Sequence, residues 1–232
     1  MSLSHLFSLM RSLLPSIYLN LKYLPIKQAI RLPILVYKPH YKRLSGTVAI
    51  ESNNFYFGMI RLGFNSNDGY PNNGITIKND GMIVFKGKCS LSNDSFVSIG
   101  KTGKIIFGDD YRAGAGLKLI SHCGISFGKQ TRIGWGNLIM DTNFHPLYDL
   151  EKKKFKKAYG KISIGDNNWI ATQCMTMPGV TTPDFCIFGA RTVITRGGKY
   201  ESYCVHGGSP VRVLSRNVKR IIGQDQIEDY SK

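Results

Sequence analysis

The sequence predicts an all-β fold in which the chain winds as a three-sided coil of short parallel strands, with short helical segments at both ends. The main observation is a repeat of six residues, carried by Ile164, Ile170, Thr176, Thr182, Phe188 and Ile194. This period matches neither the 3.6 residues of a helical turn nor the simple alternation of a strand. It fits three flat faces joined by corners, so that every sixth side chain points into the centre of a triangle.

The same register continues upstream, which is the second observation. Two further series are spaced by six: Phe107, Ala113, Leu119 and Ile125, and then Phe127, Ile133, Ile139 and His145. Turn-forming residues supply the third observation, because Gly, Asn and Asp tolerate the backbone that tight corners need. They recur at 79–81, 108–110 and 165–168. An ordinary β-sandwich with short strands, the alternative, has no reason to keep one register across residues 164–194.

The first 45 residues form a different kind of segment. Apolar residues fall at helical spacing between Leu3 and Leu21, and Pro25, Pro33 and Pro39 end any longer helix. Arg11 interrupts the apolar stretch, so we expect neither a removable signal peptide nor a membrane-spanning helix. Basic residues follow the helix. It either caps the open end of the coil or lies on an anionic membrane surface.

These patterns divide the chain into three parts. Residues 1–45 are the helical segment, residues 46–215 are the coil, and residues 216–232 are a tail in which 217–230 favours a short helix. Between Ile139 and Ile162 the repeat stops, which predicts a loop at about 141–161 that leaves the coil.

Composition restricts the class of partner and the compartment. The formal net charge is +16 over 232 residues, which indicates an anionic partner. We expect no nucleic acid, since no recognition motif accompanies the charge. Five cysteines, an odd number without a C-x-x-C pair, favour reduced thiols and a cytoplasmic protein.

The interrupting loop carries the candidate chemistry. A neutral imidazole such as that of His145 can accept a proton from a hydroxyl group at neutral pH. Asp141 and Asn143 stand close to it in the sequence; they either orient the imidazole or serve as turn residues. No metal site is expected.

Three blocks of sequence resemble the hexapeptide-repeat acyltransferases. They are Ile164-Gly-Asp-Asn-Asn-Trp169-Ile-Ala171-Thr172, Phe188-Gly-Ala190-Arg191-Thr-Val-Ile-Thr195-Arg196, and His206-Gly-Gly-Ser-Pro210-Val-Arg212. The closer similarity is to the maltose and galactoside O-acetyltransferases and to their relatives in capsular-polysaccharide biosynthesis, and it covers residues ~70–215.

The resemblance implies a single-stranded left-handed parallel β-helix that forms a homotrimer, with acetyl-CoA held between neighbouring subunits. It makes His145 the general base and places Trp169 in the acceptor pocket. The positions that it assigns to the binding of acetyl-CoA are Ala171, Thr172, Ala190, Thr195, Arg196 and Arg212.

Together these points predict an acetyl-CoA-dependent O-acetyltransferase acting on a sugar hydroxyl of a cell-surface polysaccharide or its precursor. It would be cytoplasmic, either free or at the inner face of the plasma membrane. Two alternatives remain open: an N-acetyltransferase of an amino sugar, and a non-catalytic β-helix scaffold. A metal enzyme of the carbonic anhydrase type needs three histidines, and the coil region offers only His122 and His145.

Overall fold

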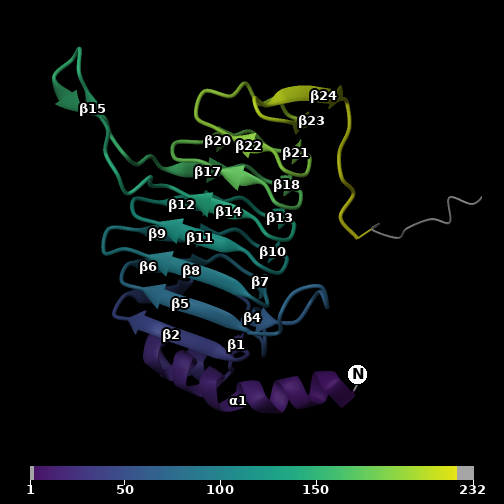
Figure 1. The fold of residues 1–232 in the computed structure, drawn as a ribbon. Coiled ribbons are helices and arrows are strands. Elements are labelled where there is room, and N and C mark those ends of the chain that lie inside the picture. The colour runs from purple at the N-terminus through teal and green to yellow at the C-terminus, as the bar shows by residue number, and fades with distance from the viewer. Residues whose placement is uncertain (1–2, 224–232) are drawn as a thin grey trace, which may run out of the picture.

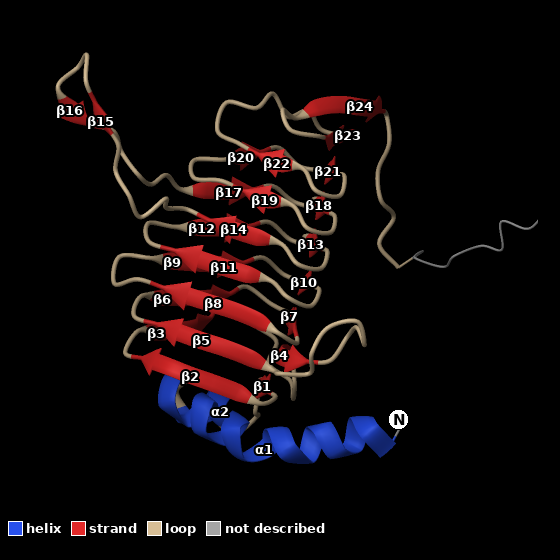
Figure 2. Cartoon of the chain, in the orientation of Figure 1, coloured by secondary structure: helices blue, strands red, loops and turns tan. Residues whose placement is uncertain are grey.

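Three parallel sheets surround one core in the computed structural model, which describes residues 3–223, with side chains from residue 8 onward (Figures 1 and 2). Successive strands pass from the first sheet to the second and then to the third, so that one turn of the coil contributes one strand to each sheet. This is the triangular coil that the six-residue repeat predicts.

The strands of each sheet are as follows. The first sheet has β1 (Ile34–Val36), β4 (Ile60–Phe64), β7 (Cys89–Ser92), β10 (Tyr111–Ala113), β13 (Arg132–Ile133), β18 (Trp169–Ile170), β21 (Cys186–Phe188), β23 (Cys204–Gly207) and β24 (Arg212–Arg216). The second has β2 (Pro39–Leu44), β5 (Ile75–Asn79), β8 (Ser95–Ile99), β11 (Lys118–Ser121), β14 (Leu138–Met140), β19 (Met175–Thr176) and β22 (Val193–Ile194). The third has β3 (Thr47–Ile50), β6 (Met82–Phe85), β9 (Lys104–Phe107), β12 (Ile125–Phe127), β17 (Ile162–Ile164) and β20 (Thr181–Thr182). All of these pairs are parallel except β23 with β24.

The repeat positions form stacked columns inside the coil. In the first sheet Ile133 pairs with Ile170, which pairs in turn with Phe188. Side chains at all six positions from Ile164 to Ile194 are at most 4% exposed. Every added coil therefore removes apolar surface from water above and below it. One position of the upstream series departs from this pattern: His145 is exposed, because the chain has already left the coil there.

The coil has three corners, which position the residues discussed below. The first corner joins the first sheet to the second, the second corner joins the second sheet to the third, and the third corner leads back to the first sheet. Left-handed backbone occurs at these corners, at Asp110 (φ 52°) and Asn167 (φ 56°) as the sequence predicts. It also occurs at Gln173 and Phe185, which sequence rules do not favour.

The N-terminal helices close one end of the coil (Figure 1). Helix α1 (Leu3–Tyr23) is followed by α2 (Ile26–Ala29), and α1 packs along β1. The Asn20 amide donates to the Ile34 carbonyl (2.7 Å) and its oxygen accepts from the Ile34 N–H (3.2 Å), while Ser16 Oγ accepts from the Val36 N–H (2.9 Å). Buried side chains of the helix thus satisfy the backbone groups that the first strand of a sheet would leave unpaired. Strands β1 and β2 already belong to the coil, so it begins inside the segment that the sequence assigns to the cap.

Two segments leave the coil at the other end. Between β14 and β17 the chain extends into a hairpin of β15 (Tyr148–Asp149) and β16 (Lys154–Phe155), here called the arm, residues 141–161. After β24 the tail runs back along the first sheet (Figure 1), with the Val218 N–H donating to the Tyr203 carbonyl (3.0 Å). Its residues 217–223 are not helical, which corrects the expected helix for that part; residues 224–230 lie outside the described chain.

No helix in residues 3–223 is long and apolar enough to cross a membrane.

Candidate functional site

Small residues form a column along the first corner of the coil. Ala171 and Thr172 follow β18, and Ala190 occupies the same corner one coil further on. The coils are joined by backbone hydrogen bonds, from the Ala171 N–H to the Phe188 carbonyl (2.9 Å) and from the Arg191 N–H to the Thr172 carbonyl (3.0 Å). The parallel stacking therefore brings these three predicted residues to one edge of the molecule.

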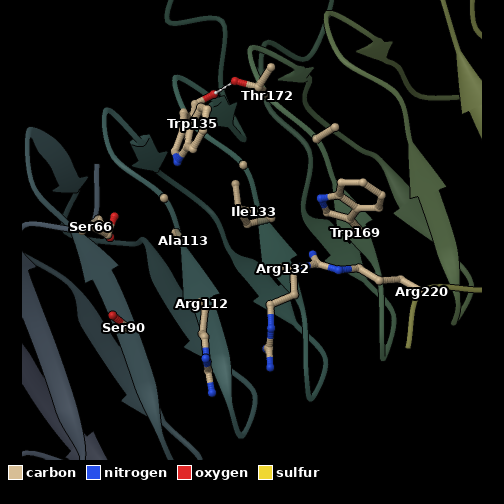
Figure 3. A pocket seen from close by; sticks show the side chains of 14 residues that line it. Ser66, Ser90, Arg112, Ala113, Arg132, Ile133, Trp135, Trp169, Thr172 and Arg220 are labelled. Carbon is tan, nitrogen blue, oxygen red and sulfur yellow. Dashed lines mark hydrogen bonds between the residues drawn. The ribbon is translucent and has the colours of Figure 1, made fainter. Parts of the chain in front are cut away.

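A cleft of about 620 Å³ lies beside this column, across β7, β10, β13 and β18 of the first sheet (Figure 3). Trp169, Ala171 and Thr172 line it, as does Trp135 from the coil below. Thr172 Oγ1 donates to the Trp135 carbonyl (2.9 Å), which ties the two coils together at the rim. We call this the tryptophan cleft.

The tryptophan cleft is positively charged. Arg112 and Arg132 project from neighbouring strands, and both pair with Asp110; the shorter contact joins Arg132 Nη2 to Asp110 Oδ2 at 2.5 Å. Burial raises the pKa of the Asp110 carboxyl, but the hydrogen bond and charge of Arg132, with those of Arg112, outweigh it and hold this pKa below its ordinary value. Two guanidinium groups against one carboxylate leave a net positive charge on this wall.

The C-terminal tail closes one side of this cleft. The Arg220 guanidinium lies over the Trp169 ring, 4.7 Å from its centroid, in a cation–π contact (Figure 3). The indole is therefore held between the sheet and the tail, half-buried.

A second cleft, of about 750 Å³, lies near the last coils and holds the predicted basic residues. Thr195, Arg196 and Arg212 line it, together with Lys199. Three cations in one cleft, with Glu201 as the only acidic residue in its lining, favour an anionic group such as a phosphate. Ala190 lines neither this cleft nor the tryptophan cleft.

His145 lies elsewhere, on the arm that leaves the second corner. Its side chain is exposed and lines neither cleft, and its N–H donates to the Asn143 carbonyl (2.7 Å). The arm projects away from the coil (Figure 1). The second sheet separates this corner from the column of small residues, so a single chain does not bring His145 to Trp169.

Asp141 fixes the base of the arm instead of orienting the imidazole. Its buried carboxylate accepts hydrogen bonds from the backbone N–H groups of His122 (2.6 Å), Cys123 (2.9 Å) and Gly124 (2.6 Å). Ser121 Oγ donates to it as well (2.8 Å). These four donors occupy the carboxylate and tie the arm to the preceding coil, which fits the second of the two expected roles, that of a turn residue. Asn143 is exposed and contacts the His145 backbone only through its carbonyl.

The cysteines of this protein are not suited to act as nucleophiles at the clefts. All five cysteines are free. Burial raises the pKa of the Cys186 thiol to about 12 and raises those of Cys89 and Cys174. Such thiols carry little thiolate at neutral pH, and no cysteine lines either cleft. Within residues 3–223 no cluster of three or more His, Cys, Asp or Glu side chains could hold a metal ion.

Sequence reasoning missed much of the tryptophan cleft. The sequence did not identify Trp135, because the arm interrupts the repeat between Ile133 and Ile170. Their pairing in the structure places the residues two positions after them, Trp135 and Thr172, at one corner. Arg112 lies in no recognisable sequence motif, so the sequence did not mark it as a site residue. Arg220 lies in the tail, whose course no repeat specifies.

The sequence and the fold are similar to those of known acetyltransferases. No family model matches the chain. It is 33% identical over 142 residues to an uncharacterized 24.8 kDa protein in the cps region of Klebsiella pneumoniae, covering 61% of this chain and 62% of that protein. It is 23% identical over 119 residues to the polysialic acid O-acetyltransferase of Escherichia coli O1:K1, covering 51% of this chain and 38% of that enzyme. The chain thus spans less than two thirds of the length of these relatives.

The fold is also found in a solved acetyltransferase structure. The polySia-specific acetyltransferase NeuO superimposes with a TM-score of 0.55 at 16% identity, covering 82% of this chain and 91% of that one. Together with the sequence matches, this likeness confirms the resemblance to the O-acetyltransferases that the sequence predicts.

Proposed function

We propose that this protein is an O-acetyltransferase that moves the acetyl group of acetyl-CoA to a sugar hydroxyl of a cell-surface polysaccharide or its precursor. The observation that carries the proposal is the similarity to a polysaccharide O-acetyltransferase in a chain whose coil is interrupted between β14 and β17 by an arm that presents a histidine. The left-handed sense of the coil is part of this proposal, and so is the division into cap, coil and tail.

The two clefts suit the donor. The second cleft offers Arg196, Lys199 and Arg212 for the phosphates of acetyl-CoA. The small-residue column of Ala171, Thr172 and Ala190 leaves room for the slender pantetheine arm to reach the tryptophan cleft. Because acetyl-CoA is a cytoplasmic metabolite, the reaction belongs to that compartment.

His145 completes the site in this proposal by acting across a subunit boundary. It and Trp169 lie at opposite edges of the second sheet, so an arm of one protomer must meet the cleft of its partner. A closed ring in which one corner packs against the other gives each site one arm and one cleft. The resemblance to the hexapeptide-repeat acyltransferases implies three copies in this ring.

The proposed reaction is direct transfer. His145 removes the proton of the acceptor hydroxyl, the oxygen attacks the thioester carbonyl, and a carbon–oxygen bond forms. The carbon–sulfur bond then breaks, and the proton passes from His145 to the departing thiolate of CoA. The raised thiol pKa values support a route without a cysteine intermediate. Asp141 supports the arm but takes no proton.

An assay with purified protein tests the proposal. Release of free CoA from acetyl-CoA is followed in the presence of candidate polysaccharides, nucleotide sugars and amino sugars. The masses of the products are measured by mass spectrometry. We expect a gain of one acetyl group on oxygen, removable by mild base. Base-stable acetylation of amino sugars would establish the N-transferase alternative, and no release with any acceptor, without binding of acetyl-CoA, would favour a scaffold.

A further inference from the structure

The outer face of the N-terminal helices is apolar and uncovered in the described chain. Five exposed side chains follow one stripe of α1 at helical spacing: Met10, Leu14, Ile17, Tyr18 and Leu21. Ile26 and Ile30 continue the surface at α2 and just beyond it. Leu14 is 80% exposed and Ile30 is 71% exposed. We call this set the basal face.

The opposite side of α1 is already used. Ser12, Ser16 and Asn20 are fully buried, and Ser16 and Asn20 bond to the backbone of β1. The helix cannot turn its apolar stripe inward without breaking these hydrogen bonds, so the exposure of the basal face follows from how α1 caps the coil. Apolar patches of this kind on a protein surface mark interaction sites.

The charged residues of the N-terminal segment are all basic. Residues 1–50 contain seven basic residues and no Asp or Glu. Lys22, Lys27 and Arg31 are exposed, and each directly follows an exposed apolar residue of this set in the sequence. Arg43 forms an ion pair with Asp80 (2.8 Å), so its charge is neutralised and is not counted among the basic groups that could contact a partner.

We propose that the basal face docks on an anionic lipid bilayer, with α1 lying in the plane of the surface. An apolar stripe bordered by lysine and arginine is the pattern of a helix that rests at the boundary between headgroups and acyl chains. Basic residues next to it add attraction to negatively charged headgroups. This proposal does not depend on the acetyl-transfer reaction.

A second copy of the chain is the less favourable occupant. If two basal faces packed on each other, the lysines and arginines of one would face those of the other, and no acidic residue of the first 50 could compensate them. A bilayer with anionic headgroups satisfies the apolar stripe and the charge together.

Docking on the basal face also sets the height of the clefts. Five strand spacings separate β1 from β18 in the first sheet. At about 4.8 Å each, Trp169 stands about 24 Å above β1 when the coil is upright, and α1, about 10 Å thick, lies between β1 and the lipid. The enzyme would then work on material that extends from the membrane.

Vesicle sedimentation with the full chain tests the proposal. The probes are phosphatidylcholine vesicles with and without a third of phosphatidylglycerol, at low and high salt. We expect binding to the anionic vesicles that weakens as salt screens the charges. Leu14→Glu with Leu21→Glu should reduce binding at least about tenfold. Two leucines that would enter the lipid are lost, and two negative charges are added. Lys27→Ala should reduce it by about fivefold.

The control variant carries the same change on another exposed surface. Leu147→Glu with Leu150→Glu places two glutamates on the arm, where both leucines are exposed, and should bind vesicles like the wild type. Circular dichroism checks that each variant is folded. Equal binding of the helix variant and the wild type, or no binding of the wild type to anionic vesicles, overturns the proposal. So does a loss of oligomers on substitution of Leu14 and Leu21, since a second copy would then be the occupant.

Discussion

His145 is the side chain on which the proposed chemistry depends. It is exposed on the arm, with its ring free of the hydrogen bonds that occupy Asp141 at the arm's base. That exposure suits a base whose partners come from another protomer and from the acceptor. The neighbouring carboxylate, which looks like an obvious partner in the sequence, is instead a structural residue.

Replacing His145 by alanine should lower kcat by about 10²–10⁴-fold, the usual contribution of a general base, and leave the KM for acetyl-CoA nearly unchanged. Steady-state kinetics of CoA release measure both constants. His40→Ala is the matched control, because His40 is also exposed but lies on β2, far from the arm in the coil. A His145→Ala enzyme that turns over at the wild-type rate would refute the assignment.

His206 illustrates the opposite case of a histidine inside the core. It is fully buried, stacks on Phe188 with ring centroids 5.2 Å apart, and accepts a hydrogen bond from the Glu201 N–H at Nε2 (3.1 Å). Burial lowers its pKa below the ordinary value. The unfolded chain therefore binds a proton at a higher pH than the folded chain does.

The contribution of His206 to the free energy of unfolding should consequently be largest above about pH 6.5. It should fall as the pH drops below this value, because His206 then takes up a proton in the unfolded chain but not yet in the folded chain. Urea unfolding at a series of pH values measures the slope. In His206→Leu the slope between about pH 6.5 and 5 should become shallower, even though the variant is less stable overall. A slope that is unchanged by His206→Leu but altered by His40→Leu would contradict this account.

At the scale of elements, the capping helix and the arm behave differently. Helix α1 is tied to β1 by buried side chains, whereas the arm is attached through its base alone. The sequence predicts both elements, since helical spacing and a broken repeat are visible in it. It does not predict that Ser16 and Asn20 satisfy the edge of β1, because this requires knowing which face of the helix meets which strand.

Asn20→Leu should destabilise the protein by about 2 to 4 kcal/mol, because the Ile34 N–H and carbonyl are left buried without partners. Urea unfolding measures the change. Leu21 is the next residue in the sequence but lies on the exposed face of α1, so Leu21→Ala should alter the free energy of unfolding by no more than about 0.5 kcal/mol. Equal effects of the two substitutions would mean that α1 does not seal the coil through Asn20.

For the whole molecule, the regular part is predictable and the irregular parts are not. The six-residue repeat identifies the side chains that point inward, but the arm breaks its phase. The pairing of Ile133 with Ile170, and with it the shared corner of Trp135 and Thr172, therefore comes from the structure. The course of the tail over Trp169 and the direction of the arm depend on few contacts, none of them periodic. For the same reason, the sequence could group the candidate residues only by resemblance, while the coil divides them between two corners.

Under the proposed function, that division requires residues of two chains at each site. His145 belongs to the second corner, and Trp169 belongs to the first sheet beside the first corner. The central claim is that an arm from one protomer serves the cleft of its neighbour.

Mixed oligomers test this claim most directly. His145→Ala and Trp169→Ala chains, each nearly inactive alone, are co-expressed with different tags, and oligomers carrying both tags are isolated and assayed for CoA release. If each site joins the arm of one chain to the cleft of another, every mixed ring of three has one junction at which an intact arm meets an intact cleft, so about a third of the wild-type sites should be restored. Mixed oligomers that are as inactive as either parent, although wild-type oligomers isolated in the same way are active, would contradict the account.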